Sequence, residues 1–362
     1  MNKEISVGNV KQKKSVFRSF CNAGFFVLLI TLTFYILLRD QNLGELWNTI
    51  CKINPIWIIV AIGCMILFVC CEGINICVGL NMLGKTHGLN LLSCIRYAVY
   101  GYFYSNITPS STGGQPMQIY EMHKDGIDIS QSSIILLLIL ANYQTVTVSY
   151  ALISFAIRFE ELKNVGTSIT LLLGIGIFFN LIVLTLLIIS IFFKKASSCL
   201  LHGLVSLLHR LHIEKADKIG QKIETQLTEY HRCSACIRAN PMRIFSIFLV
   251  TCIQIALLHS IPYWIYCSFG LSDYSLFNIM TMQAVLYMTL SAVPLPGGIG
   301  VSESGFLILY RALFPAALLS SAMLVYRGIS FYFCVALSGL LILLFKIIIT
   351  IKSRKRACKA SL

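Results

Sequence analysis

Charged residues are scarce in this chain. Asp, Glu, Lys and Arg make up 12% of its 362 residues, whereas a soluble globular domain carries about 25%. Hydrophobic residues make up 57%. A chain with so little charge cannot give a folded domain a water-exposed surface of ordinary composition, which excludes a soluble globular protein. The composition predicts an integral membrane protein that consists of one membrane domain.

The sequence motifs of common enzyme classes are also missing. The chain has no H-E-x-x-H zinc motif, no P-loop and no G-x-S-x-G nucleophile motif. Cys233 and Cys236 have C-x-x-C spacing, but no second pair completes a zinc site. We therefore expect no metal and no cofactor, and we identify no catalytic residue.

Acidic residues are fewer than basic ones, 15 against 29, and the basic excess is concentrated. Twenty of the 29 Lys and Arg residues fall in three segments that flank apolar runs: residues 1–19, 194–243 and 346–362. Such an excess is typical of cytoplasmic loops beside anionic lipid head groups. We therefore expect a multi-pass protein of the cell membrane with both termini cytoplasmic. Because the basic clusters lie next to membrane segments, we expect no nucleic-acid partner.

Apolar runs between these clusters predict six membrane-spanning helices, each close to the 20 or so residues that a bilayer requires. The predicted spans are residues 20–38, 56–80, 132–157, 167–193, 245–269 and 316–345.

The predicted spans define a membrane domain over residues 20–345, with halves 20–193 and 244–345 joined by residues 194–243. Leucines and isoleucines recur at three- and four-residue steps in the first part of this linker. That spacing indicates an amphipathic cytoplasmic helix, either on the membrane surface or packed against the protein.

Two polar stretches interrupt the apolar pattern, one in each half, at residues 105–121 and 291–304. Proline and glycine break helices, and non-helical backbone persists at membrane depth only when it is buried in protein or lines a watery cavity. Short apolar segments flank each stretch, which predicts two re-entrant helical hairpins. From the charge distribution, we expect the first hairpin to open toward the cytoplasm and the second to open toward the outside. The expected fold is an all-α polytopic membrane protein with about six full spans and two re-entrant hairpins arranged as an inverted pair.

The interrupted stretches supply most of the candidate substrate site. Glycine pairs and broken helix ends present backbone N–H groups that suit an anion such as phosphate, and arginine can bind phosphate with two hydrogen bonds. The candidate binding residues are Arg96, Asn106, Pro109, Gly113, Gly114, Glu121, Pro294, Pro296, Gly297, Gly298, Gly300, Glu303, Arg311 and Arg327. Structural roles are an open alternative for the charged members, since the carboxylates could pair with arginines or cap helices.

Two carboxylates in apolar surroundings are candidates for proton or ion coupling. Glu72 lies inside a predicted span, and Glu303 lies in the second interrupted stretch. Ionisable groups at membrane depth are costly and mark functional sites. For Glu72, a purely local hydrogen bond is the alternative.

Over roughly residues 15–350, the chain resembles the lysylphosphatidylglycerol synthase transmembrane-region family, also called UPF0104. The resemblance rests on Asn106-x-x-Pro109-x-x-x-Gly113-Gly114-Gln115-Pro116 and on Pro294-x-Pro296-Gly297-Gly298-Ile299-Gly300-x-x-Glu303. It adds Gln115 to the candidate site, at a position where many relatives have Glu. The resemblance implies a flippase-like domain that moves an anionic or aminoacylated phospholipid, or a related lipid-linked substrate, between leaflets. Its expected partners are membrane phospholipids.

Two alternative functions stay open. The chain could contribute to phosphatidylglycerol lysyltransferase activity, with lysyl-tRNA as donor, but we expect no aminoacyltransferase domain within it, so a separate lipid-modifying enzyme would have to supply catalysis. It could also be a lipid-binding scaffold that transports nothing. The sequence indicates neither the oligomeric state nor the direction of transport.

Overall fold

A computed structural model describes most of the membrane domain. The described residues are 43–84, 90–108, 111–165, 167–192, 232–291, 293, 295 and 298–360. Within them the regular structure is helical and no strand occurs. Several predicted features lie outside these residues: the basic segment 1–19, the span 20–38, most of the linker 194–243, and Pro109, Pro294, Pro296 and Gly297.

Five helices among the described residues are long and apolar enough to cross a membrane. They cover Pro55–Met82, Ile129–Glu160, Thr170–Ile191, Pro241–Ser268 and Ala316–Ile348. Each coincides with a predicted span. The corresponding elements are α3 (Pro55–Met82), α6 (Ile129–Val165), α7 (Thr167–Phe192), α10 (Pro241–Ser268), and a continuous run of α13 (Ala316–Arg327), a π-helical segment (Gly328–Phe333) and α14 (Cys334–Ala360). An all-helical membrane protein is therefore confirmed.

Four shorter helices lie at the two interrupted stretches. The first stretch separates α4 (Leu91–Ile107) from α5 (Gly114–Lys124), and the second separates α11 (Leu276–Ser291) from α12 (Val301–Leu309), which continues into a 3-10 turn at Tyr310–Ala312. The helices end where proline and glycine interrupt the apolar pattern, as predicted. In each pair the two helices contact one another.

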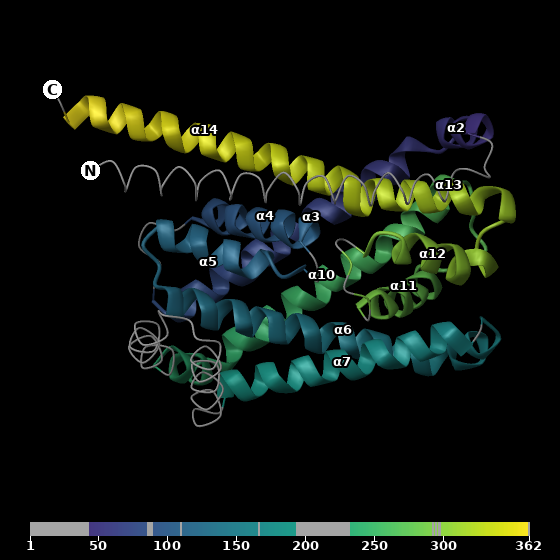
Figure 1. Cartoon of the computed structure of the whole chain (residues 1–362), viewed down its shortest axis with the longest axis horizontal. Helices are drawn as coiled ribbons and strands as arrows, with labels where there is room; N and C mark the ends of the chain where they lie inside the picture. Colours follow the sequence, from purple (N-terminus) through teal and green to yellow (C-terminus); the bar gives the residue numbers. More distant parts are fainter. Residues whose placement is uncertain are drawn as a thin grey trace, which may run out of the picture.

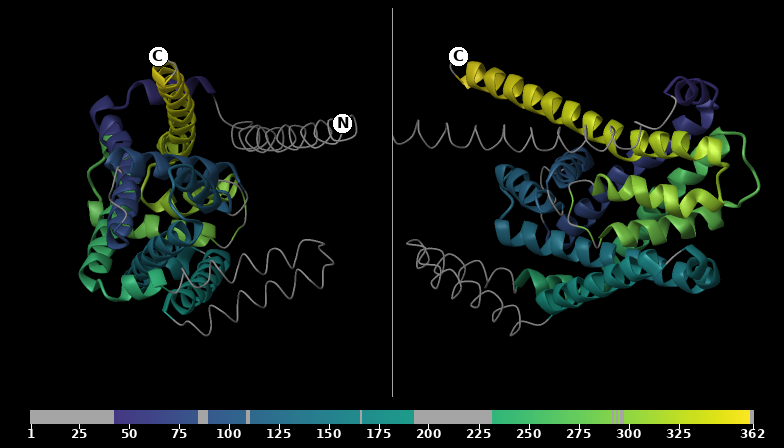
Figure 2. Two further views of the ribbon diagram at one scale, coloured as in Figure 1. Left: turned by 90° about the vertical axis from the view of Figure 1, so that its left-hand side faces the viewer. Right: turned by 45° about the vertical axis from the view of Figure 1, so that its right-hand side comes forward.

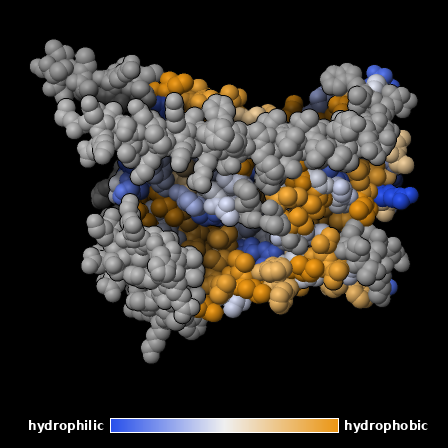
Figure 3. Space-filling view, viewed as in Figure 1, coloured by the Kyte–Doolittle hydropathy of each residue, from blue (hydrophilic) through white to orange (hydrophobic). Residues whose placement is uncertain are grey.

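The helices form layers. The paired helices α6 and α7 lie along one side of the molecule, α13 and α14 lie along the opposite side, and α4–α5 and α11–α12 lie between them (Figure 1). Figure 2 shows the same order from two further sides. In the space-filling view, hydrophobic residues predominate over α6, α7, α11 and α12, and hydrophilic residues show between them near the centre (Figure 3). The apolar side chains on this face fit contact with lipid.

Local signals in the sequence set the helix ends. Asn54 caps α3 by accepting the Ile56 N–H at 3.0 Å, and Pro55 stands in the first turn, where no backbone donor is required. The Asn54 N–H itself donates to the Ser268 carbonyl at the end of α10, at 2.9 Å. Trp57 stacks on Trp264 beside this junction, with ring centroids 5.5 Å apart. These contacts tie together the ends of the two helices that pack most extensively.

Two regions differ from the sequence-based expectation. Residues 43–51, which lie between the predicted spans 20–38 and 56–80, form helix α2 (Leu43–Cys51), which packs against α13. Helix α6 continues eight residues beyond the predicted end of its span. Arg158 is buried there, and it donates to Thr281 Oγ1 at 3.0 Å and to the Asn278 carbonyl at 2.7 Å. Because these acceptors on α11 satisfy the guanidinium, the charge does not end the helix.

Gly176 allows α7 to lie directly against the backbone of α11. A Cβ atom at this position would lie 2.3 Å from the Met288 carbonyl oxygen, far inside van der Waals contact. Small residues permit such close approach between membrane helices. Gly174, two residues earlier on the same helix, has nothing within 4 Å of its own Cβ position.

Gly176→Ala is therefore expected to destabilise the protein by about 1–3 kcal/mol, because one helix must move away from the other. Gly174→Ala is the matched control and should be neutral or slightly stabilising, since alanine is the better helix former. Thermal unfolding of the purified protein in detergent measures both. Equal effects of the two substitutions would contradict the close approach at Gly176.

Candidate functional site

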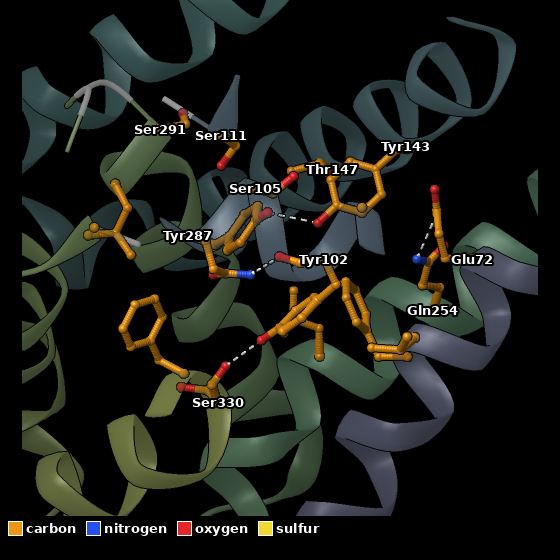
Figure 4. A pocket seen from close by; sticks show the side chains of 18 of the residues that line it. Glu72, Tyr102, Ser105, Ser111, Tyr143, Thr147, Gln254, Tyr287, Ser291 and Ser330 are labelled. Atoms are coloured by element: carbon orange, nitrogen blue, oxygen red, sulfur yellow. Dashed lines mark hydrogen bonds between the residues drawn. The ribbon is translucent and has the colours of Figure 1, made fainter. Parts of the chain in front are cut away.

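A cavity of about 710 Å³ lies within the helix bundle and is bounded by both interrupted stretches. From the first stretch, Ser105, Asn106 and Gln115 line it, and from the second, Gly298 and Ser302. Helices α3, α4, α6, α7, α10 and α11 and the π-helical segment complete the wall, and Figure 4 shows several of their polar side chains converging on the same space. Its volume is in the range of small-ligand sites.

The first interrupted stretch is held by a tight turn between α4 and α5. Thr108 Oγ1 donates to the Tyr104 carbonyl at 2.6 Å and accepts the Gly113 N–H at 2.9 Å. A Cβ atom at Gly114 would meet Ser105 Oγ at 2.0 Å and a backbone oxygen of α4 at 2.9 Å. The glycine pair therefore serves the close packing of α5 on α4, and this packing brings Ser105 to the cavity wall.

Glu303 organises the second interrupted stretch. Its Oε2 accepts the N–H of Gly300 at 2.7 Å, and its Oε1 accepts from Arg327 Nε at 2.8 Å. Gly300 has φ +86°, a conformation that favours glycine. Both charged side chains are almost fully buried, with 2% of Glu303 and 5% of Arg327 exposed. One carboxylate thus caps the broken end of α12 and binds it to the end of α13.

Arg327 stands directly before the π-helical segment. Its guanidinium lies over the ring of Phe331, 4.5 Å from the centroid, and the residue lines the cavity. π-helical turns inside α-helices occur frequently at functional sites. The Ser330 carbonyl in this segment accepts from the Tyr102 hydroxyl at 3.0 Å, which joins the segment to α4.

Glu72 contributes a carboxylate to the cavity wall. It lies at the cavity end of a network of polar side chains between α3 and α10. It accepts from Gln254 Nε2 at 3.2 Å (Figure 4). Asn75 Nδ2 donates to Gln254 Oε1 at 3.3 Å and to Thr251 Oγ1 at 3.1 Å. The last three side chains are almost completely buried. This network extends from the cavity into the interface between the two helices.

Tyrosine and carboxamide side chains from further helices complete the wall. The hydroxyl groups of Tyr143 on α6 and Tyr287 on α11 lie 2.7 Å apart (Figure 4). Asn180 on α7 donates to Ser291 Oγ at 2.6 Å, and Gln144 donates to Asn180. These residues were not identified from the sequence. The available signal was their polarity within apolar runs, but no motif distinguishes them from polar residues that serve helix packing.

The structure places the predicted site residues in three groups. Asn106, Gln115, Gly298, Arg327 and Glu72 line the cavity. Gly113, Gly114, Gly300 and Glu303 support the turns beside it, as described above.

The third group consists of described candidates that do not line the cavity. Arg96 pairs with Asp125, which also accepts from the Tyr97 hydroxyl. Glu121 pairs with Lys124 at 2.7 Å, and Arg311 is exposed on the 3-10 turn. None of the three charged candidates lines the cavity.

Comparison with known proteins places this arrangement in a family. The family model described as the lysylphosphatidylglycerol synthase TM region matches residues 23–338. A UPF0104 membrane protein of Archaeoglobus fulgidus is 24% identical over 312 residues, which cover 84% of this chain and 92% of the relative. Both interrupted stretches and all described cavity-lining residues fall inside the matched region.

The buried ion pair yields a stability prediction. Glu303→Gln is expected to destabilise the protein by about 3–5 kcal/mol, because it leaves the buried Arg327 guanidinium without its carboxylate partner. Arg327→Met should also destabilise the protein, because it leaves the buried Glu303 carboxylate without its guanidinium partner. The double variant should recover much of the loss, since neither charge then stays buried alone. Thermal unfolding in detergent gives the double-mutant cycle. Additive losses in the double variant would contradict the coupling.

Proposed function

The chain belongs to the lysylphosphatidylglycerol synthase transmembrane-region family, and from this premise we propose that it is a lipid translocase. The substrate would be an anionic or aminoacylated phospholipid, or a related lipid-linked molecule. The observation that carries the proposal is the cavity of about 710 Å³, whose wall combines apolar side chains with carboxamide and hydroxyl groups. It lies inside helices that carry many exposed apolar side chains. A scaffold that only binds lipid would also need such a site, so transport must be measured directly.

The cavity suits the passage of a head group. A polar group that crosses hydrocarbon without hydrogen bonds loses its interactions with water at high cost. The wall replaces those interactions with hydroxyl, carboxamide and backbone groups. In the proposed mechanism the head group enters the cavity while the acyl chains stay in the bilayer.

We propose that α4–α5 and α11–α12 are the two re-entrant hairpins. At 1.5 Å per residue, α5 and α12 are only about 17 Å and 14 Å long, for 11 and 9 residues. Both lengths are well below the bilayer core of about 30 Å. Each pair also brings its turn to the cavity wall. Opposite orientations of the hairpins would let the cavity open to either side in turn.

We assign ion coupling to Glu72 rather than to Glu303. The Glu303 carboxylate already accepts hydrogen bonds from Arg327 and from the Gly300 N–H. Glu72 lines the cavity and accepts a hydrogen bond from the neutral carboxamide of Gln254. A proton or cation can therefore bind Glu72 without breaking an ion pair.

Glu72→Gln is expected to abolish the response of lipid movement to an imposed proton gradient, while exchange without a gradient persists. Glu121→Gln is the control, because that carboxylate pairs with Lys124 outside the cavity wall. Proteoliposomes with a fluorescent lipid and opposed buffers measure the response. A gradient response that survives in Glu72→Gln would contradict the assignment.

Transport itself is tested by blocking the cavity. In liposomes that contain fluorescent phosphatidylglycerol or its lysyl derivative, the wild-type protein is expected to accelerate the loss of leaflet asymmetry. Gln115→Trp should slow it roughly tenfold or more, because the indole fills space beside the first turn. Tyr120→Trp, on the exposed side of the same helix, is the matched control.

Two results would argue against a translocase. Identical rates with and without protein, for every lipid offered, would favour the binding scaffold. Transfer of lysine to phosphatidylglycerol from lysyl-tRNA, measured separately with a candidate partner enzyme, would favour a role in the synthase reaction.

A further inference from the structure

The cavity wall is rich in neutral hydrogen-bonding groups and poor in charge. Six lining residues are carboxamides: Asn106, Gln115, Gln118, Gln144, Asn180 and Gln254. Six are serine or threonine: Ser105, Ser111, Thr147, Ser291, Ser302 and Ser330. Among the described lining residues, only Glu72 and Arg327 are of a charged type, and Arg327 is paired with Glu303.

Two of these hydroxyl groups are buried without a hydrogen-bond partner. They are Thr147 Oγ1 on α6 and Ser302 Oγ in the first turn of α12. The two residues are only 4% and 1% exposed, and both line the cavity. Native proteins satisfy nearly all buried polar groups. The two hydroxyls therefore have unused hydrogen-bonding capacity beside the cavity.

We propose that the head group bound in this cavity is polyhydroxylated, that is, a sugar or polyol unit attached to a lipid. Each hydroxyl of such a unit both donates and accepts, and a carboxamide presents a donor and an acceptor side by side. Thr147 and Ser302 bind two of its hydroxyls, and Glu72 accepts a third. The rings of Tyr143 and Tyr287 supply apolar surface for the carbon skeleton. The inference rests on the proposed function and names the substrate class of the same site.

A simple phosphate or ammonium head group matches the wall less well. Phosphate binding favours a cation whose charge is not already neutralised, but the carboxylate of Glu303 holds Arg327. An ammonium group would use Glu72 and leave most of the carboxamides without a role. A hydroxyl-rich unit uses the polar groups that are most numerous in the wall.

The test compares three fluorescent lipids with the same acyl chains in proteoliposomes: a glucosyl diacylglycerol, phosphatidylglycerol and phosphatidylethanolamine. The glucosyl lipid is expected to lose its leaflet asymmetry about tenfold faster than phosphatidylethanolamine, the effect of one or two net hydrogen bonds. Thr147→Val and Ser302→Ala should each slow the glucosyl lipid roughly three- to tenfold and leave the rate of phosphatidylethanolamine unchanged.

The chain offers a matched control for each variant. Thr145→Val lies on the same helix as Thr147, but its hydroxyl bonds the Ala141 carbonyl and is not part of the wall. Ser304→Ala lies two residues after Ser302 at an exposed position outside the wall. Both controls should behave as the wild type with every lipid.

A second measurement separates this inference from the translocase proposal. Binding of a short-chain glucosyl lipid in detergent should raise the thermal unfolding temperature of the wild type more than that of Thr147→Val. Stabilisation without any lipid movement would support the head-group inference and overturn transport. Movement of all three lipids at one rate, unaffected by Thr147→Val and Ser302→Ala, would overturn the inference and keep transport. Neither binding nor movement would overturn both.

Discussion

The ion pair between Glu303 and Arg327 is the constraint on which the second half of the structure depends. A charge buried among apolar helices is tolerated only when it is paired and hydrogen-bonded. Glu303 also satisfies the N–H of Gly300, a donor that the broken helix end would otherwise leave exposed to a low-dielectric surrounding. A single carboxylate therefore solves two problems, the open end of α12 and the buried guanidinium of Arg327, and in doing so fixes one wall of the cavity.

The remaining walls follow the same rule of polar satisfaction by different means. Carboxamides and hydroxyls join helices in pairs, as Gln254 does between α3 and α10 and Asn180 does between α7 and α11. Glycines bring backbones close enough for such short side chains to reach, as Gly114 does at the first turn and Gly176 does beside α11. The cavity is thus formed by pairs of helices that are each tied together locally. The polar groups in its described wall are mostly uncharged.

Much of the fold follows from the sequence, because apolar runs of bilayer length and proline–glycine interruptions are local signals. These signals located five described spans and both turns. The partners of the site residues depend on packing between distant helices, which local patterns do not contain. The arginines illustrate this: Arg327 reaches the cavity, Arg96 pairs with Asp125, and Arg158 is buried against α11. The sequence patterns identified the first two as candidates but not the third.

The π-helical segment Gly328–Phe333 accommodates one more residue than an α-helical turn would. Removing a residue from it would restore a regular α-helix while the flanking helices keep their places, α13 beside α12 and α14 beside α4. The number of residues in this segment can therefore change by one without a change in the rest of the fold. Relatives that differ here by a single deletion would share the same bundle and yet present a different surface, with Ser330 and Phe331 reoriented, to whatever occupies the cavity.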